Sequence, residues 1–408
     1  MKNTFRKIEK KSNLEKFLVW ELISLHKEQG SGDFEKIVRD LFDKITKKNK
    51  QFFFIKYFDC LYNMLHSFSE KRIFFKGDRF KQFISETKKE FPVGMIVSGI
   101  SDRLYAIKNF IPYISFSPFY KYVDKYFKTG DKKYLKEVTQ KMGTLLKKRD
   151  IDSIVLWNDC FPLDRALILE ARKKNIPTIQ IQVGLHISTY QPENGREADF
   201  IFVWGDFFRD MYDQYNVRDK KNIYTLGYPR EIKKFPSTKK IKRVVYLGQN
   251  IEKFNSSLFK TKIDTLNQLN QLCKKNNLCF KYRPHPNDDI KSILKEIPNL
   301  NLSIGKLEDT LKEADILVSF YSTSLVEGAM AGKICIQLTN YPMSAGNFEK
   351  LGICKSFTSI KSFEKHLKKI VDNLEVGLSF KFNSYYINQP KEVKKKFVRL
   401  LKKVLKKK

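Results

Sequence analysis

The sequence is poor in paired cysteines and in long apolar runs, and each absence excludes a class of protein. Its six cysteines include no CxxC pair, and several lie within apolar segments. This pattern argues against a zinc site or a disulfide framework and indicates reduced thiols in a cytoplasmic protein. Near the N-terminus, the apolar stretch FLVW at residues 17–20 is followed at once by Glu21. We therefore predict no signal peptide, and no other window is long enough to span a bilayer.

Common nucleotide and metal motifs are also absent. The chain has no GxxxxGK(S/T) loop, which argues against a P-loop NTPase, and no GxGxxG follows an expected strand, which argues against dinucleotide binding. The segment NDD at residues 287–289 is the nearest approach to the DxD motif of metal-dependent transferases. Its two carboxylates are placed to cap a helix that starts near Ile290. We predict no metal site.

Basic residues greatly outnumber acidic ones, and the formal net charge is +33. One interpretation is that lysine fills solvated faces; the other is attraction to an anionic surface, either nucleic acid or lipid headgroups. In the C-terminal stretch, Val393, Phe397 and Leu401 recur at helical spacing between basic residues. A basic amphipathic helix is typical of membrane-surface binding. The alternative is a terminal helix that packs its apolar stripe on the protein and exposes its lysines.

The order of apolar and polar segments predicts an α/β protein. A β-α-β unit begins at Asp152, and a second series of such units begins at Arg243. Their short apolar strands are typical of parallel sheets covered on both faces. Residues 1 to about 90 read as helices and irregular basic segments. Beyond them we expect strands at 92–98, 153–157, 178–183, 200–204, 243–248, 278–282, 316–320 and 334–338 and helices at 102–110, 163–174, 258–275, 309–314 and 324–331.

The length of 408 residues suits two α/β domains, each of roughly 150 to 200 residues. A polar, proline-punctuated stretch at residues 227–242 is the expected interdomain linker. We predict an N-terminal domain over residues 1–235, a C-terminal domain over 236–375 and a basic helical segment over 376–408. Two Rossmann-like domains joined by a linker imply a central cleft between them.

Polar side chains gather at the ends of the expected strands of the second domain. Arg283 and His285 follow the strand that ends at Tyr282, and a hydroxyl cluster follows the strand that ends at Phe320. In open parallel sheets, ligands bind outside the carboxyl ends of the strands, where loops and helix N-termini present donors to anions. A glycine after a strand lets the backbone approach a phosphate closely. The nucleotide-phosphate site predicted from this pattern consists of Gly248, Arg283, His285, Pro286, Ser322, Thr323, Ser324 and Glu327.

The same residues also allow purely structural interpretations. These are a turn cap for His285, a salt bridge for Arg283 and an N-cap of the following helix for the hydroxyl cluster. Glu327 stands three residues after Ser324, which is the spacing of a capping box. Because capping and phosphate binding use the same geometry, the two roles are compatible for the hydroxyl cluster.

Several segments occur in an order found in a known family. They are QVG at 182–184, ADFIFVWG at 198–205, GYP at 227–229, HP at 285–286 and STSLVE at 322–327. Together they resemble bacterial surface-polysaccharide glycosyltransferases of the GT-B fold, especially the sialyltransferases, polysialyltransferases and Kdo transferases that use CMP-activated acidic sugars. The CDP-glycerol glycerophosphotransferases share much of the same C-terminal pattern. The resemblance covers roughly residues 152–338.

The resemblance implies an inverting, metal-independent glycosyltransferase that needs no cofactor beyond its nucleotide-sugar donor. The donor is expected to be a CMP-activated acidic sugar such as sialic acid or Kdo. The acceptor is expected to be a glycan or glycolipid of a capsule, O-antigen or lipooligosaccharide. Transfer of glycerol phosphate from CDP-glycerol to a teichoic-acid-like polymer is the alternative. The expected location is the inner face of the cytoplasmic membrane, bound through the basic C-terminal helix.

The chemistry of such a transfer explains these residue types. Negative charge develops on the leaving phosphate, so hydrogen-bond donors aimed at that group stabilise the transition state. His285, with Ser322 and Thr323, would supply these donors, and Glu327 would accept hydrogen bonds from the ribose hydroxyls.

A general base must also activate the acceptor hydroxyl, and two candidates follow strands of the first domain. Asp159 stands where related sialyltransferases carry a catalytic acidic residue, and His186 resembles the histidine that follows a strand in the glycerophosphotransferases. Asn158 and Gln182 are expected beside them on the acceptor side. The structural alternatives are an N-cap for Asp159 and a loop hydrogen bond for His186.

A basic nucleic-acid-binding protein without catalytic activity is the competing class. Charge alone motivates it, since no recognisable RNA or DNA module interleaves aromatic with basic residues. We therefore expect no nucleic-acid partner.

Overall fold

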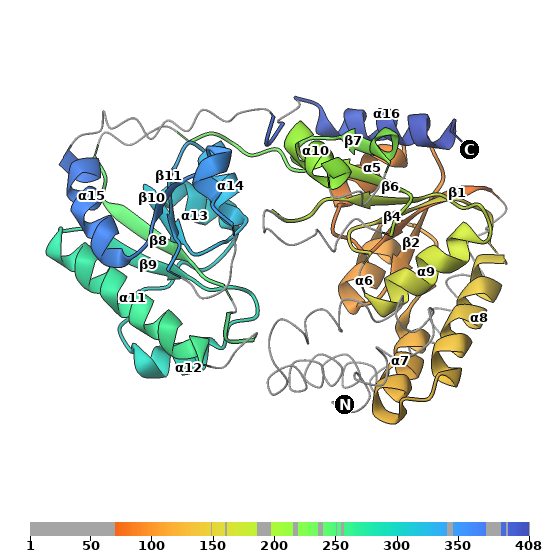
Figure 1. Cartoon of the computed structure of the whole chain (residues 1–408), viewed down its shortest axis with the longest axis horizontal. Coiled ribbons are helices and arrows are strands. Elements are labelled where there is room, and N and C mark those ends of the chain that lie inside the picture. The colour runs from red at the N-terminus through yellow and green to blue at the C-terminus, as the bar shows by residue number, and fades with distance from the viewer. Residues whose placement is uncertain are drawn as a thin grey trace. The chain divides into compact units, whose positions relative to one another are not determined.

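The computed structural model describes residues 70–147, 149–159, 161–185, 197–214, 219–235, 240–249, 251–253, 257–340, 346–372, 385–388 and 391–407. They form two compact units, both drawn in Figure 1. The first contains the described residues up to 183, within 192–229 and from 387 onward, and the second contains residues 184–185 and the described residues of 230–386. Apart from residues 184–185, the described chain passes from the first unit to the second between Pro229 and Arg230, inside the stretch predicted as a linker, and returns to the first unit between Tyr386 and Ile387.

The first unit is built on a seven-stranded parallel sheet. Its strands are β1 (Arg72–Lys76), β2 (Val93–Val97), β3 (Tyr113–Ser115), β4 (Ile151–Leu156), β5 (Thr178–Ile181), β6 (Phe200–Val203) and β7 (Ile223–Thr225). They lie in the order β3-β2-β1-β4-β5-β6-β7, and every neighbouring pair is parallel. The strand order changes direction between β1 and β4, as in a doubly wound sheet.

Helices cover both faces of this sheet (Figure 1). Helices α7 (Ser117–Thr129), α8 (Lys133–Lys147) and α9 (Pro162–Arg172) pack on the face that contains Phe74 and Ile154. Helices α5 (Lys81–Thr87), α6 (Ile100–Lys108) and α16 (Val393–Leu405) pack on the face that contains Phe75 and Val155. Helix α10 (Asp206–Gln214) and the short η1 (Lys220–Asn222) also belong to this unit. Adjacent residues serve opposite faces because successive strand side chains alternate in direction.

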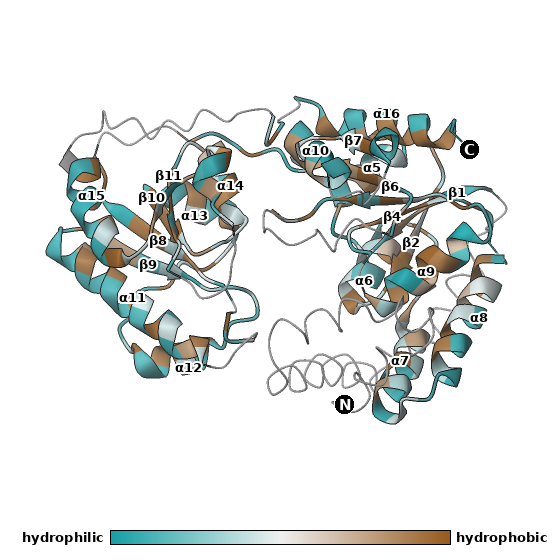
Figure 2. Cartoon of the chain, viewed as in Figure 1, coloured by the Kyte–Doolittle hydropathy of each residue, from teal (hydrophilic) through white to brown (hydrophobic). Residues whose placement is uncertain are grey.

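The C-terminal helix α16 is part of the core of the first unit. Val393, Phe397, Leu401 and Val404 are buried, and the ring of Phe397 stacks on that of Phe83 in α5 with centroids 4.6 Å apart. Figure 2 shows hydrophobic and hydrophilic residues alternating along α16, as an amphipathic helix requires. The structure therefore matches the packing alternative of the sequence analysis. The apolar stripe is not available to a bilayer, and only the charged face remains for an anionic partner.

The second unit is built on a five-stranded parallel sheet. Its strands are β8 (Arg243–Leu247), β9 (Cys279–Arg283), β10 (Ile316–Ser319), β11 (Ile334–Leu338) and β12 (Lys355–Phe357), in the order β12-β11-β10-β8-β9. Its helices are α11 (Leu258–Lys275), α12 (Ile290–Glu296), α13 (Leu307–Glu313), α14 (Ser324–Met330) and α15 (Ile360–Asp372), with the short η2 (Ile251–Lys253) and η3 (Phe348–Leu351). After β8 the chain adds β9 on one side and then β10 on the other. This reversal makes the β8–β10 boundary a topological switch point.

The predicted α/β class is confirmed, and a strand lies at each position where one was expected from residue 92 onward. Helix α11 spans the predicted residues 258–275. The expectation for residues 1 to about 90 was wrong at β1, whose sequence RIFFK is a central strand. A single short apolar run looks the same in a buried strand and in a buried helix, so periodicity could not identify it. The edge strands β3, β7 and β12, each of three residues, were not predicted.

The described cysteines are free thiols. Cys273, Cys335 and Cys354 are buried and Cys279 is exposed. Burial raises the pKa of both Cys273 and Cys354 to about 12, so these two remain protonated and unreactive near neutral pH. Within the described part of the chain, no helix has the length and apolarity needed to cross a membrane.

Candidate functional site

Gln249 joins the carboxyl ends of β8 and β10 at the switch point of the second unit. Its side-chain oxygen Oε1 accepts hydrogen bonds from the hydroxyl of Ser319 at 3.0 Å and from the backbone amide of Tyr321 at 3.1 Å. Gln249 and Ser319 are both buried. In doubly wound sheets this edge is where ligands bind. The loops after β8 and β10, which carry Gly248 and Ser322 of the predicted phosphate site, are therefore anchored to each other at that edge.

Gly248 lets the ends of β8 and β9 approach closely. Its amide donates a hydrogen bond to the carbonyl of Arg283 at 2.8 Å. A Cβ atom on Gly248 would lie 2.6 Å from the hydroxyl of Tyr282 and 2.8 Å from the carbonyl oxygen of Arg283. Any larger residue would therefore push the two strand ends apart. The close approach is to the neighbouring strand, and the predicted approach to a phosphate stays a prediction.

His285 lies half-buried in a turn directly after β9. Its ring nitrogen Nδ1 accepts a hydrogen bond from the amide of Asn287 at 3.2 Å, and its carbonyl accepts one from the amide of Asp288 at 2.9 Å. The turn-cap interpretation of His285 thus holds. Because Nδ1 is an acceptor in this turn, the proton of the neutral ring belongs on Nε2. A ring with Nε2–H is a hydrogen-bond donor, as the phosphate role requires.

A buried polar cluster supports the His285 turn. Oδ2 of Asp288 accepts hydrogen bonds from the amide of His285 at 2.7 Å and from the hydroxyl of Tyr282, while Oδ1 accepts one from Nζ of Lys262 at 2.8 Å. The same Nζ pairs with Oε2 of Glu252 at 2.6 Å. The side chains of Lys262 and Asp288 are 1% and 0% exposed, so both charges are removed from water. Burial, and then the charge of Asp288, raise the pKa of Tyr282 far above its ordinary value, which keeps the hydroxyl protonated and donating.

The guanidinium of Arg283 is engaged by the loop that leads into α13. It donates to the hydroxyl of Thr310 at 2.9 Å and to the carbonyls of Gly305 and Lys306 at 3.0 and 3.3 Å. Burial lowers its pKa from the ordinary value. These partners are neutral, so they do not form the salt bridge that was the alternative for Arg283. Its contact with a phosphate stays a prediction.

Ser322, Thr323 and Ser324 form the half-buried turn into α14. The hydroxyl of Ser322 accepts a hydrogen bond from the amide of Ser324 at 3.3 Å. The side chain of Thr323, the N-cap residue, makes no capping hydrogen bond. Ser322 therefore performs the capping that was predicted for the cluster, and its hydroxyl proton is not needed for that role.

Glu327 lies in α14 and forms an ion pair with Arg230. Nη1 of Arg230 is 2.9 Å from Oε1 of Glu327, whose side chain is only 5% exposed, compared with 56% for Arg230. The N-cap of α14 is Thr323, so the capping box suggested by the spacing of Ser324 and Glu327 is not formed. The carboxylate of Glu327 instead forms the ion pair with the guanidinium of Arg230. Its predicted contact with a ribose stays a prediction.

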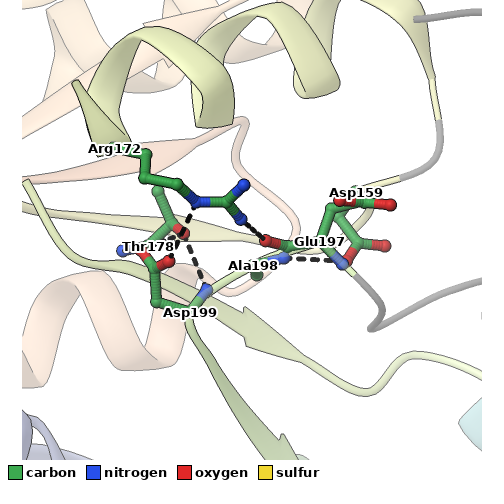
Figure 3. Close-up of polar contacts among 6 residues, drawn as sticks. All are labelled: Asp159, Arg172, Thr178, Glu197, Ala198 and Asp199. Carbon is green, nitrogen blue, oxygen red and sulfur yellow. Dashed lines mark hydrogen bonds and ion pairs between the residues drawn. The ribbon is translucent and has the colours of Figure 1, made fainter. Parts of the chain in front are cut away.

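Asp159 follows β4 at the carboxyl edge of the first sheet, and its side chain is fully buried. Oδ2 accepts hydrogen bonds from the amides of Glu197 at 2.7 Å and Ala198 at 3.1 Å, in the segment that leads into β6 (Figure 3). It does not cap α9, whose N-cap residue is Phe161. Asp159 therefore fixes the backbone at Glu197 and Ala198 in this structure, and its role as a general base stays a prediction.

Two further residues fix the same segment (Figure 3). Arg172 of α9 donates to the carbonyl of Glu197 at 2.8 Å. The hydroxyl of Thr178 in β5 donates to Oδ2 of Asp199 at 2.8 Å, and the amide of Asp199 donates back to that hydroxyl at 2.9 Å. The start of β6 is thus tied to α9, β5 and the loop after β4.

Asn158 and Gln182, predicted on the acceptor side, are also buried and bonded to backbone. Oδ1 of Asn158 accepts from the amide of Phe161 at 3.3 Å. Oε1 of Gln182 accepts from the amide of Trp204 at 2.9 Å, and the Gln182 carbonyl accepts from the indole N–H of Trp204 at 2.9 Å. His186, the second candidate base, lies outside the described residues.

Sequence reasoning missed Gln249, Lys262 and Arg230 and gave Asp288 a different role. Only its neighbour Asp289 caps α12, by accepting from the amide of Ser292 at 3.2 Å. A signal existed for Lys262, because it falls on the buried face of α11, where a lysine needs a partner. Gln249 stands directly after the expected strand 243–248, which is the positional signal that selected His285, and Arg230 carries no comparable signal. Among the described residues, no group of three or more His, Cys, Asp or Glu side chains is arranged to hold a metal ion.

No protein-family model and no curated protein matches this sequence, but many solved structures resemble its fold. MnaA from S. aureus, solved with UDP, has a TM-score of 0.59 and 13% identity, with 83% of this chain and 97% of that chain covered. UDP-GlcNAc 2-epimerase from Neisseria meningitidis, bound to UDP-GlcNAc, has a TM-score of 0.55 and 14% identity, covering 82% and 100%. MurG from Acinetobacter baumannii has a TM-score of 0.56 and 11% identity, covering 82% and 100%.

At such low identity these likenesses establish the fold and leave the activity open. Each unit is a doubly wound α/β domain on a parallel sheet, and the alignments extend over most of the chain. The fold predicted from the sequence is therefore confirmed: this chain has the GT-B fold, with two Rossmann-like domains.

Proposed function

We propose that the protein is an inverting, metal-independent glycosyltransferase that takes a sugar from a nucleotide-activated donor. The observation that supports this most is the carboxyl edge of the second sheet, where β9, β8 and β10 are neighbours. His285 follows β9, Gln249 follows β8, and the hydroxyls of Ser322 and Thr323 follow β10. An imidazole N–H and two hydroxyls beside a topological switch point suit the binding of a phosphate group.

In the proposed reaction, the oxygen of an acceptor hydroxyl attacks the anomeric carbon of the donor sugar. The bond between that carbon and the phosphate oxygen breaks, and its electron pair leaves with the nucleotide. Hydrogen bonds from Nε2 of His285 and from the hydroxyls of Ser322 and Thr323 stabilise the charge that develops on the leaving phosphate. The hydroxyl proton passes to a general base, and attack from the face opposite the phosphate inverts the anomeric centre.

The two candidates for the base differ in what supports them. Asp159 is fully buried and accepts two backbone amides, whereas a base must come within hydrogen-bond reach of a substrate hydroxyl. His186 rests on its sequence context alone. Comparing Asp159→Asn with His186→Gln distinguishes them. A variant that loses transfer rate but keeps its melting temperature identifies the base. A variant that loses transfer rate and also melts at a lower temperature identifies a structural residue.

For the donor we propose a CMP-activated acidic sugar such as sialic acid or Kdo, added to a capsule, O-antigen or lipooligosaccharide glycan. The sequence resemblance supports cytidine, and CDP-glycerol is the alternative within that resemblance. The fold comparison supports a uridine nucleotide instead, because two of the similar proteins were solved with UDP or UDP-GlcNAc. That observation also makes epimerisation of a UDP-sugar the second candidate function, and a product formed without any acceptor would reveal it.

We also propose that the charged face of α16 draws the protein to anionic lipid headgroups at the inner face of the cytoplasmic membrane. Because the apolar stripe of α16 is buried, this attraction is electrostatic alone and should weaken with salt. Co-sedimentation with phosphatidylglycerol vesicles, compared with phosphatidylcholine vesicles, tests it. Binding should fall in the double variant Arg399→Glu/Lys406→Glu, which replaces two exposed cations, one in α16 and one directly after it. Equal binding to the neutral vesicles would contradict the proposal.

The central experiment is a calorimetric titration of the protein with CMP, CDP, UDP and GDP. We expect one nucleotide to bind and to raise the melting temperature, since a ligand of the folded state stabilises it by mass action. The variant His285→Ala should lose most of this affinity. His366→Ala is the matched control, because His366 is an exposed histidine of the same unit, on α15. Its ring contacts Phe357 at the end of β12, and β11 separates that strand from β10.

Each outcome of the titration selects a function. Binding of CMP supports CMP-linked acidic sugars, binding of CDP supports glycerol phosphate transfer, and binding of UDP supports a UDP-sugar enzyme. Equal affinity in His285→Ala and His366→Ala would remove His285 from the site. If no nucleotide binds, the transferase proposal fails, and nucleic-acid binding with a steep salt dependence becomes the hypothesis to test.

A further inference from the structure

Asp288 connects the turn that carries His285 to a charge buried inside the second unit. One carboxylate oxygen, Oδ2, accepts the amide of His285 and the hydroxyl of Tyr282, and the other, Oδ1, accepts Nζ of Lys262. Asp288 thus spans three elements: the end of β9, helix α11 and its own turn. A carboxylate with donors on both oxygens has a fixed orientation, so it fixes the amide of His285 as well.

Lys262 is held as firmly as Asp288. It lies on the buried face of α11, its side chain is 1% exposed, and it pairs with Glu252 as well as with Asp288. A buried charge without its partner is strongly unfavourable, so Lys262 and Asp288 are constrained to stay together. The fixed position of Asp288 also fixes the turn. The amide of His285 can keep its hydrogen bond to Asp288 only if the backbone at His285 does not move.

The turn in its present shape selects one form of the imidazole. The amide of Asn287 points at Nδ1 of His285 at 3.2 Å, and an amide hydrogen can be accepted only by a ring nitrogen that carries no proton. We infer that Asp288, anchored by Lys262 and Tyr282, is a positioning residue that holds His285 as the Nε2–H tautomer. The use of that Nε2–H as a donor to a leaving phosphate rests on the proposed function, but the tautomer does not.

The test is a heteronuclear NMR spectrum of protein labelled with ¹⁵N in its five histidines, recorded near pH 8, about 1.5 units above the ordinary titration point of histidine. The His285 signals are assigned by their loss in His285→Ala. In the wild-type protein we expect the pattern of the Nε2–H tautomer. The Asn side chain in Asp288→Asn has one acceptor oxygen, so its NH₂ group must face either Lys262 or the donors of Tyr282 and His285. The turn then loses its fixed position, and we expect signals of both tautomers.

The matched control is Asp289→Asn, the same chemical change one residue further along. Asp289 contacts Ser292 at the start of α12 and is not part of the cluster, so the His285 signals should not change. His366 in the same spectra reports any general loss of structure in the second unit. Should Asp288→Asn not fold, Tyr282→Phe removes one donor from the same oxygen and should shift the tautomer ratio in the same direction by a smaller amount.

The inference is overturned if wild-type His285 is the Nδ1–H tautomer, or if Asp288→Asn keeps a pure Nε2–H signal while remaining folded. Nucleotide titration of the same variants separates this result from the proposed function. If nucleotide binds the wild type, transfer by Asp288→Asn should fall on the order of 100-fold, the scale expected when a catalytic group moves by about 1 Å. If no nucleotide binds, the proposed function fails while the tautomer result still decides the role of Asp288.

Discussion

Each unit buries a lysine–aspartate pair near the carboxyl edge of its sheet, but the surroundings of the two pairs differ. In the first unit, Lys76 at the end of β1 pairs with Asp164 in α9, and the two side chains are 7% and 0% exposed. Apart from this ion pair, neither carboxylate oxygen of Asp164 receives a hydrogen bond from the described residues. The ammonium group of Lys76 lies 5.8 and 5.6 Å from the ring centroids of Phe116 and Trp157. This pair is set in aromatic surroundings.

In the second unit, Lys262 and Asp288 belong to a polar network. Lys262 also pairs with Glu252, and Asp288 also accepts hydrogen bonds from the hydroxyl of Tyr282 and the amide of His285. A buried ion pair alone is weak evidence of stabilisation, because apolar residues of similar volume often replace it without loss of stability. The comparison indicates that the informative feature is the set of additional donors and acceptors. In the second unit, those groups come from η2, from β9 and from the turn that carries His285.

The largest loss of stability is expected from Lys76→Met in the first unit. This change leaves the buried charge of Asp164 without its cation, which should lower the free energy of unfolding by about 3–5 kcal/mol. Among the described tryptophans, Trp157 and Trp204 both lie in the first unit, so their fluorescence during urea unfolding follows that unit.

Lys81→Met is the control for this prediction. Lys81 pairs with Asp78 at 2.8 Å, but its side chain is 55% exposed, so the change should cost less than about 1 kcal/mol. If Lys76→Met unfolds at the same urea concentration as the wild type, Asp164 is neutral or hydrated in the native state, and the first half of the comparison is wrong.

A second prediction concerns removal of each whole pair. Lys76→Met/Asp164→Leu should restore the stability lost in Lys76→Met to within about 1 kcal/mol of the wild type, because few other polar groups depend on that pair. Lys262→Met/Asp288→Leu should remain destabilised by about 3 kcal/mol, since the Tyr282 hydroxyl and the His285 amide lose their acceptor.

Hydrogen exchange followed by mass spectrometry measures both double variants in the same way, unit by unit. Faster exchange should be confined to peptides of β9 and α12 in the second-unit variant. Equal recovery of stability by both double variants would show that the network around Asp288 adds nothing to the ion pair.

The sequence predicted the fold more completely than the site. Strands such as β10 and β11 are mostly apolar runs between polar joints, so their type and parallel arrangement follow from local pattern. His285 and Ser322 were predicted as site residues because they follow such strands closely. Asp159 was selected on the same ground, yet its carboxylate is fully buried against backbone amides. Position after a strand is visible in a sequence, whereas burial of the side chain is a property of the packed fold.

The Asp288 network could not be predicted for a related reason. Lys262 and Asp288 are 26 residues apart, and their contact depends on how α11 packs against the end of β9. The spacing of Asp289 before Ile290 does predict a helix cap, because a cap is a local contact within a few residues. Local contacts could thus be read from the sequence, and the long-range ion pair that supports the predicted site could not.

The smallest loss of stability is expected at a third ion pair, between Arg230 and Glu327. Because Gln at position 327 can still accept a hydrogen bond from Arg230, Glu327→Gln should change the free energy of unfolding by less than about 1 kcal/mol. If Glu327 also accepts from ribose hydroxyls, nucleotide affinity should nevertheless fall about tenfold, since a neutral amide is a weaker acceptor than a carboxylate. Glu308→Gln is the control, because Glu308 pairs with Lys233 on the exposed surface of the same unit. Calorimetric titration of both variants separates the two roles. If Glu327→Gln and Glu308→Gln bind nucleotide with equal affinity, Glu327 is a structural partner of Arg230, as Asp164 is of Lys76. If Glu327→Gln binds more weakly, Glu327 belongs with Asp288 among the charged residues proposed to support the nucleotide site.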